Sequence, residues 1–99
     1  MTYALLAALG DPMRRDILEK LRSGPRPVGE IAAGMPISRP AVSQHLKVLK
    51  DSGLVTETRA GTRHYFAIAP EGIGELRAYL DGLWSDALAA FARHAEGKR

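Results

Sequence analysis

The sequence predicts a mainly α-helical fold with one small β-hairpin, and three observations support this fold class. Apolar residues recur at intervals of three and four along most of the 99 residues, and glycine and proline separate these stretches. Residues 54–68 differ, because they are rich in the residue types that favour strands. A chain of this length forms one domain, residues 1–99, that buries only roughly 60–65 % of its unfolded surface. A partner subunit would therefore add to its stability.

Two short helices are expected at the start of the chain. Residues 2–9 are almost entirely apolar, and Gly10 is placed to end their helix. Asp11 then has the position of an N-cap, with Pro12 at the first helical position of a second helix over residues 12–23. The apolar stripe of that helix consists of Met13, Ile17, Leu18 and Leu21.

The next two helices are joined by a tight turn. Pro27 is expected to open a short third helix that ends near Gly34. Ser38 caps a longer fourth helix, which tolerates Pro40 in its first turn and ends at Gly53. Its buried side would consist of Val42, Leu46 and Leu49. Two helices arranged in this way, the second being longer, form a helix-turn-helix.

A β-hairpin follows directly. Residues 54–59 and 63–68 are its expected strands, and the short connection between them contains Gly61. Its apolar side chains, which we expect to pack the ribbon against the body, are Tyr65, Phe66 and Ile68. A two-stranded ribbon placed after a helix-turn-helix makes the winged version of that motif.

The last expected helix spans residues 71–95 and is roughly 35 Å long at ~1.5 Å per residue. It is too apolar on too many sides for a 99-residue monomer to cover, and residues 2–9 share this excess. We therefore expect a two-fold homodimer through these two helices. The expected interface residues are Leu5, Leu6, Leu9, Leu76, Leu80, Leu83, Trp84, Ala87 and Phe91. The alternative is that the last helix closes the core of the monomer.

Basic residues are concentrated in the first two-thirds of the chain. Residues 1–68 hold 10 basic and 6 acidic side chains, whereas residues 69–99 hold 4 and 5. This distribution suits a polyanion-binding core, residues 11–68, that is carried on a near-neutral dimerisation part. A solvated surface with an accidental excess of charge is the alternative.

Composition also limits the function. The chain has no cysteines, so disulfides, thiolate metal sites and cysteine nucleophiles are absent. No apolar run approaches the ~18–20 residues that span a bilayer, and no basic region precedes the first apolar stretch. We therefore expect a cytoplasmic protein without a membrane partner. No nucleophile–base pair, carboxylate pair or phosphate-binding glycine loop is evident, so neither an enzyme nor a cofactor is expected.

The polar face of the fourth helix is the candidate for DNA recognition. In a helix-turn-helix, the N-terminal residues of the second helix meet base edges in the major groove. Gln can pair with adenine, Arg with guanine and Ser with either, while Lys suits phosphates. The expected contact residues are Ser38, Arg39, Pro40, Ser43, Gln44, Lys47 and Lys50. His45 has two open interpretations, a contact to DNA or a place at the edge of the core.

The hairpin tip supplies a second candidate set, Arg59, Thr62 and Arg63. Basic residues there contribute little stability, so contact with a minor groove or a phosphate backbone is a better explanation of them. An ordinary polar hairpin tip is the alternative.

The motifs together resemble the ArsR/SmtB family of bacterial winged-helix repressors. The family's run of Ser-x-His-Leu-x-x-Leu, followed by a Gly-Leu-Val strand start, is matched by Ser43, His45, Leu46, Leu49, Gly53, Leu54 and Val55. The upstream stretch ALGDPMRRDILEKL is similar to the opening of the family's second helix. The resemblance implies a homodimer built on the first and last helices. It also implies that the dimer binds a palindromic operator and blocks transcription until a signal weakens binding.

Two departures from the family pattern bear on the signal and on the wing. Metal-sensing members carry a cysteine pair before the recognition helix, or Asp, His and Glu ligands across paired last helices; this chain has no cysteine there and no Asp-x-His arrangement. The last helix, which contains Trp84, resembles that of the branch without metal sites, and the wing has Gly61-Thr62 in place of the common Gly-Arg. Two alternatives stay open, a protein-binding winged helix and a metal-responsive repressor that uses Asp81, Asp86, His94 and Glu96.

Overall fold

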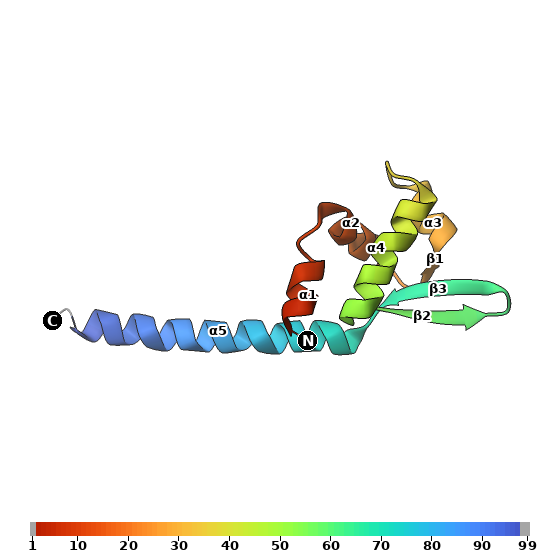
Figure 1. Cartoon of the computed structure of the whole chain (residues 1–99). Coiled ribbons are helices and arrows are strands. Elements are labelled where there is room, and N and C mark those ends of the chain that lie inside the picture. The colour runs from red at the N-terminus through yellow and green to blue at the C-terminus, as the bar shows by residue number, and fades with distance from the viewer. Residues whose placement is uncertain (1, 98–99) are drawn as a thin grey trace.

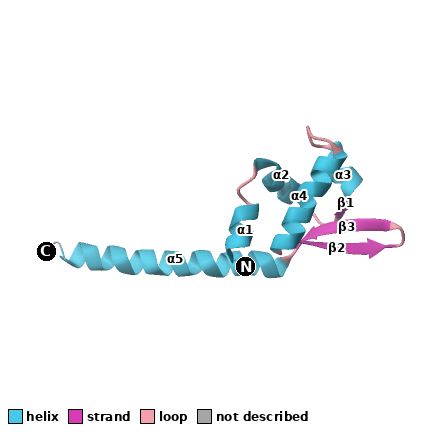
Figure 2. Ribbon diagram, in the orientation of Figure 1, coloured by secondary structure: helices cyan, strands magenta, loops and turns pink. Residues whose placement is uncertain are grey.

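Five helices and three strands make up residues 2–97, the part of the chain that the structure describes (Figure 1). The structure is a computed structural model. Its elements are, in order, α1 (Thr2–Ala8), α2 (Pro12–Leu21), β1 (Arg26–Pro27), α3 (Val28–Ala33), α4 (Arg39–Ser52), β2 (Val55–Ala60), β3 (Arg63–Ile68) and α5 (Pro70–Gly97). Helices dominate, and the one small sheet lies at the side of the helical body (Figure 2). The predicted fold class, mainly α with a small hairpin, is confirmed.

The ends of α2 and α4 follow from the predicted capping residues. The Asp11 carboxylate accepts hydrogen bonds from the backbone N–H of Met13 and Arg14, at 2.7 and 3.2 Å. Ser38 Oγ accepts from the N–H of Ala41 at 3.2 Å. Gly53 ends α4 with a φ of 95°, the left-handed conformation that glycine adopts at low cost.

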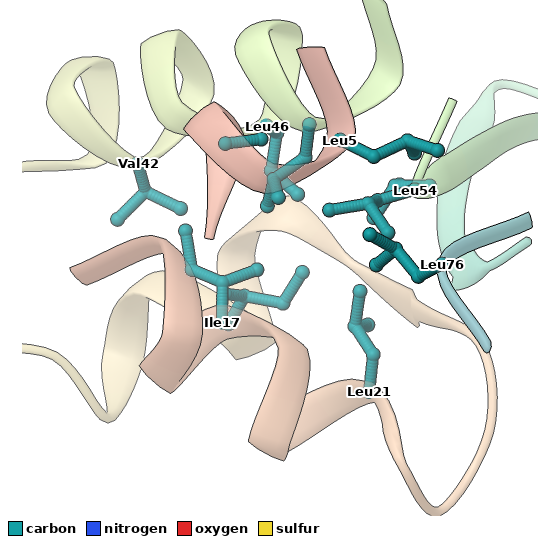
Figure 3. Close-up of a cluster of buried hydrophobic side chains, with 11 residues drawn as sticks. Leu5, Ile17, Leu21, Val42, Leu46, Leu54 and Leu76 are labelled. Atoms are coloured by element: carbon teal, nitrogen blue, oxygen red, sulfur yellow. The ribbon is translucent and has the colours of Figure 1, made fainter. Parts of the chain in front are cut away.

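One hydrophobic core lies between α1, α2, α4 and the start of α5, as Figure 3 shows. Its buried members are Leu5, Ala8, Ile17, Leu21, Ile31, Val42, Leu46, Leu49, Leu54, Val55 and Leu76. The apolar stripe predicted for α4 is confirmed, because its three residues are at most 1 % exposed. Leu5 and Leu76 are also core residues, although the sequence predicted them at a surface shared between subunits. Each is covered within a single chain.

The sheet has a third strand that the sequence analysis did not predict. β1 pairs with β3, which pairs with β2, and both pairings are antiparallel. As predicted, Pro27 comes directly before the third helix, where it is the N-cap of α3, and it also belongs to β1. A two-residue strand has no alternating pattern to detect, and a proline is tolerated there because β1 is an edge strand.

The hairpin closes with a two-residue turn. Ala60 faces Arg63 in the register, which leaves only Gly61 and Thr62 in the connection. Gly61 has a φ of 65°, and no residue other than glycine has a positive φ within residues 2–97. Glycine at the first turn position fits a type II′ turn, whose twist matches that of the strands. The hairpin therefore projects from the body as a regular ribbon, the wing (Figure 2).

A close junction connects the wing to α5. Ala69, the single residue between β3 and α5, donates a backbone hydrogen bond to Leu54 O at 2.8 Å and accepts one from Ile73 N at 3.2 Å. A Cβ atom on Gly72 would lie 2.1 Å from Gly53 O. The first turn of α5 thus packs directly on the end of α4, and a glycine is required for that approach.

Beyond this junction α5 leaves the body. The helix has 28 residues, starting one residue before and ending two residues after the predicted span. Every residue from Leu80 to Gly97 is exposed, and the molecule is 66 Å long as a result. Figure 1 shows α5 and the wing extending in opposite directions. Of the helices in residues 2–97, α5 included, none is apolar and long enough to cross a membrane.

Candidate nucleic-acid interface

The recognition face predicted on α4 is solvent-exposed. Val42, Leu46 and Leu49 point into the core, so the polar residues on the opposite side of the helix face outward. The exposed set consists of Ser38, Arg39, Pro40, Ser43, Gln44, Lys47 and Lys50. Separation of an apolar and a polar face along one helix leaves the polar side chains of the first turns available to a ligand.

A groove of about 500 Å³ runs between the start of α4 and the wing. Arg39 and Ser43 line it from α4, and Thr62 and Arg63 line it from the hairpin. The structure thus brings together side chains that the sequence placed on two separate elements. Gln44 is exposed but does not line this groove, and neither does Arg59.

The wing arginines differ in their surroundings. The Arg63 guanidinium lies over the Tyr65 ring, with Cζ 5.7 Å from the ring centroid. This cation–π contact holds Arg63 against its own strand. Arg59 Nη2 lies 3.4 Å from His64 Nε2, across the register. Both arginines and Thr62 are exposed.

The two lysines of the recognition face are each paired with a carboxylate. Lys47 Nζ lies 2.8 Å from Asp51 Oδ2, one turn along α4. Lys50 Nζ lies 2.9 Å from Glu57 Oε1 on β2. The hydrogen bond to Glu57 raises the pKa of Lys50, and hydrogen bonds from Lys50 and His64 hold the pKa of Glu57 below its usual range. Both shifts favour the charged pair.

His45 lies at the edge of the core. It is half-buried, between the exposed Gln44 and the buried Leu46. It lies close enough to Asp11, the N-cap of α2, to affect that carboxylate electrostatically. Partial desolvation raises the pKa of Asp11, but two backbone hydrogen bonds and the nearby His45 outweigh it and hold that pKa below its ordinary value. This position matches one of the two interpretations that the sequence left open, and a contact from His45 to DNA stays a prediction.

Glu57 and His64 belong to the same surface, although the sequence analysis did not include them in the site. Both line the groove beside Arg39 and Arg63. The hairpin register could have revealed them. A two-residue turn pairs Arg59 with His64, and because alternate strand residues share a face, Glu57 lies diagonally opposite His64.

A second exposed surface consists of apolar residues on α5. Leu80, Leu83, Trp84 and Phe91 are 50–73 % exposed, and Ala87 is exposed as well. Leu88 and, on α1, Tyr3 extend this surface beyond the predicted set. Leu6 and Leu9 are half-buried and pack on the core. The Tyr3 and Tyr79 rings meet edge to face with centroids 6.4 Å apart, so α1 is in contact with α5.

The acidic residues and His94 of α5 do not converge on one point. Among residues 2–97 of a single chain, no group of three or more His, Cys, Asp or Glu side chains has a geometry that could hold a metal ion. Ligands shared between two chains are a separate arrangement. The metal-responsive alternative therefore requires a site whose ligands come from two chains.

Comparisons with known proteins agree with this geometry. Residues 11–57 match the family described as "Bacterial regulatory protein, arsR family". The HTH-type transcriptional regulator Rv2034 of Mycobacterium tuberculosis is 51 % identical over 86 residues, which are 87 % of this chain and 80 % of that protein. The transcriptional repressor SdpR of Bacillus subtilis is 38 % identical over 62 % of this chain and 68 % of its own.

Solved structures give the same answer. An ArsR-like transcriptional regulator from Rhodococcus sp. RHA1 superposes with a TM-score of 0.79 at 26 % identity, over 93 % of this chain and 90 % of that one. The homodimeric winged helix-turn-helix DNA-binding domain of Mb0332 from Mycobacterium bovis superposes with a TM-score of 0.69 at 33 % identity, over 85 % and 78 %. The chain therefore belongs to the ArsR family of bacterial regulatory proteins, whose members are DNA-binding transcriptional regulators and repressors with a winged helix-turn-helix fold, and not enzymes.

Proposed function

We propose that this protein is a homodimeric repressor that binds a palindromic operator with α4 and the wing and is released by a signal. One observation carries the proposal: the exposed polar face of α4 and the basic hairpin tip border the same groove. The repressor SdpR and the homodimeric Mb0332 domain, both similar to this chain, support it. Such a regulator acts in the cytoplasm, where bacterial DNA lies.

In this proposal α4 reads the major groove, which is ~12 Å wide and admits a helix. Ser43 and Gln44 contact base edges, with Arg39 beside them at the start of the helix. Ser38 and Pro40 position that start against the phosphate backbone. These roles follow from position, because all five residues are exposed in the first turns of α4. The side chains there can reach base edges, and the N-terminal end of a helix favours phosphate.

The remaining side chains of the predicted contact set hold the phosphate backbone. Lys47 and Lys50 lie further along α4, and each already has a carboxylate partner that DNA would have to compete with or share. Arg59, Thr62 and Arg63 contact the backbone or the minor groove next to the major-groove site. Phosphate contacts of this kind set register and affinity but carry no sequence information.

The dimer forms through α1 and α5. We divide residues 1–99 into a DNA-binding core, 11–68, and dimerisation helices, 2–9 and 71–95. The exposed leucine and aromatic side chains on α5 support this division, since monomers rarely leave so many on one surface. A two-fold dimer presents two α4 helices in opposite directions, and its operator is then a palindrome with half-sites about one DNA turn apart.

Selection of bound sequences from random DNA tests the proposal. The wild-type protein should enrich a palindrome, and binding to it should be measured by fluorescence anisotropy. Gln44→Ala should cost ~1–3 kcal/mol at one base pair of each half-site and relax specificity there. Lys47→Ala is the matched control, because a phosphate contact weakens binding uniformly across sequences. Equal loss across all sequences for Gln44→Ala would contradict a base contact.

The signal is sought with the same complex. The operator-bound protein should be challenged with metal ions and with small molecules, and release followed by anisotropy. A zinc titration that shows no binding at micromolar concentration removes the metal-responsive alternative. Binding of zinc together with release would establish it.

A further inference from the structure

The Glu57 carboxylate joins three elements of the DNA-binding surface. Its Oε1 atom accepts a hydrogen bond from Lys50 Nζ of α4 at 2.9 Å. Its Oε2 atom is hydrogen-bonded to Nδ1 of His64 on β3, whose other ring nitrogen lies 3.4 Å from Arg59 Nη2. A chain of polar contacts thus leads from the recognition helix through β2 to the wing.

This carboxylate is more shielded than a typical surface acid. Its side chain is 23 % exposed, against 51 % for Lys50 and 43 % for His64. The pKa of Glu57 is lowered by its partners, so the carboxylate is charged over the neutral pH range. A charged acceptor makes stronger hydrogen bonds than a neutral one, and partial shielding limits competition from water.

The base of the wing packs on the core through Val55, Phe66 and Ile68, but its polar contacts with α4 are few. Among the described residues, the hydrogen bond between Lys50 and Glu57 is the one side-chain hydrogen bond from α4 to the hairpin. The third strand, β1, pairs with Tyr65 and Phe66 only, so the ribbon from residue 59 to residue 64 extends beyond it. A two-stranded ribbon of this kind is marginally stable by itself.

We propose that Glu57 is a positioning residue for DNA recognition, which ties the wing to the recognition helix through Lys50 and His64. The inference rests on the proposed operator binding. Specific binding needs α4 and the wing tip at a fixed separation, because both must fit their grooves at once. Non-specific binding through phosphates tolerates variation in that separation. Glu57 therefore raises the preference for operator over other DNA.

The chain contains a matched control for this contact. Asp51 also pairs with a lysine of the recognition face, at 2.8 Å, but that pair lies within α4 and does not reach the wing. Glu57→Gln and Asp51→Asn each remove one negative charge and release one lysine. Both variants should therefore bind a scrambled duplex more tightly and by a similar factor.

The test compares the selected operator with a scrambled duplex of the same length at one salt concentration. Glu57→Gln should lower the ratio of operator affinity to scrambled-duplex affinity by at least about fivefold, and Asp51→Asn should leave it within about twofold. Equal ratios in the two variants would overturn the inference. Both variants should keep the wild-type circular dichroism and urea midpoint, since each substitution keeps the size of the side chain and leaves the apolar core intact.

A second measurement needs no DNA. In the full-length free protein, ¹⁵N relaxation should show lower order parameters at residues 59–64 in Glu57→Gln, but not in Asp51→Asn. Lys50→Gln removes the same contact from the side of the helix and should have the same effect. Unchanged order parameters in Glu57→Gln would overturn the inference, whereas a wild-type protein that does not distinguish the two duplexes would overturn the proposed function instead.

Discussion

The two halves of α5 carry similar apolar residues in opposite surroundings. Near its start, Leu76 is buried and Gly72 touches the backbone of the α4–β2 turn. From Leu80 onward the same spacing of leucine continues, but each residue is exposed. One helical pattern therefore serves two purposes. Its first part completes the core of the chain, and its second part presents an exposed apolar surface, the proposed dimer interface.

The difference has an energetic meaning. Burial of a leucine side chain stabilises by roughly 1.5–3 kcal/mol relative to exposure. Core residues such as Leu46 and Leu49 realise that stabilisation within one chain, because they are 1 % and 0 % exposed. Leu83 and Leu88 are each 50 % exposed, so a single chain realises only part of that stabilisation at these positions. The core of the body and the outer half of α5 should therefore respond differently to mutation.

The largest effect is expected in the core. Leu46→Ala should lower the free energy of unfolding by about 2–5 kcal/mol, because it leaves a cavity between α4 and the other helices. Urea denaturation at two protein concentrations measures the loss, which should be the same at both. Leu83→Ala is the counterpart on α5, and it should change mainly how the midpoint depends on concentration. A loss below about 1 kcal/mol for Leu46→Ala would contradict its place in the core.

The next effect is expected at the proposed interface. Leu83→Glu combined with Leu88→Glu places charges on the apolar surface, so the protein should sediment as a monomer while its circular dichroism changes little. Operator affinity should then fall at least about 100-fold, since the DNA-binding core of each monomer binds its half-site alone. Ser85→Glu, on an exposed position outside the apolar stripe, is the control. A dimer mass for the double variant would argue against this interface.

The smallest effect on stability is expected at Asp11, the carboxylate that caps α2. Asp11 caps α2, and its pKa in the folded protein lies below the ordinary value of 3.8. The folded state thus binds this proton less readily than the unfolded state does. The resulting stabilisation is present above pH 3.8 and disappears as the pH falls through the lower folded-state pKa.

Asp11→Asn keeps an oxygen that can accept at the cap but cannot ionise. The stability advantage of wild type over this variant should therefore be present at pH 6 and shrink below pH 4, as urea denaturation across that range would measure. Asp86→Asn, an exposed position on α5, is the control and should leave the pH dependence unchanged. An advantage that stays constant down to pH 2 would contradict a lowered pKa at Asp11.

Features that depend on a few neighbouring residues were predictable from the sequence. Asp11, Ser38 and Gly53 fix helix ends through contacts within four residues, so their types and positions were sufficient. The exposed face of α4 followed from the buried spacing of its apolar side. The strand β1 was missed because two residues, one of them proline, carry no periodic signal, and its pairing depends on Phe66, far along the chain.

Features that depend on what covers a surface were not predictable. Periodicity showed that α1 and α5 are apolar, but it could not distinguish a core of one chain from a shared surface. Leu5 and Leu76 were therefore assigned to the interface although the chain buries them itself. The exposed recognition residues were correctly predicted as exposed, but the pairing of Lys50 with Glu57 required the position of the hairpin relative to α4.

A single residue, Ala69, connects β3 to α5, and this short connection bears on the spacing of the two half-sites in an operator. Ala69 is buried and its backbone is hydrogen-bonded to Leu54 and Ile73, so the base of the wing is held directly on the start of α5. In a dimer, the angle at which two α5 helices cross would then set the distance and the relative rotation of the two DNA-binding cores. One base pair added between half-sites rotates one of them by about a tenth of a DNA turn. A connection this short limits how far a DNA-binding core can rotate to follow its half-site, so operator affinity should depend on the spacing of the half-sites.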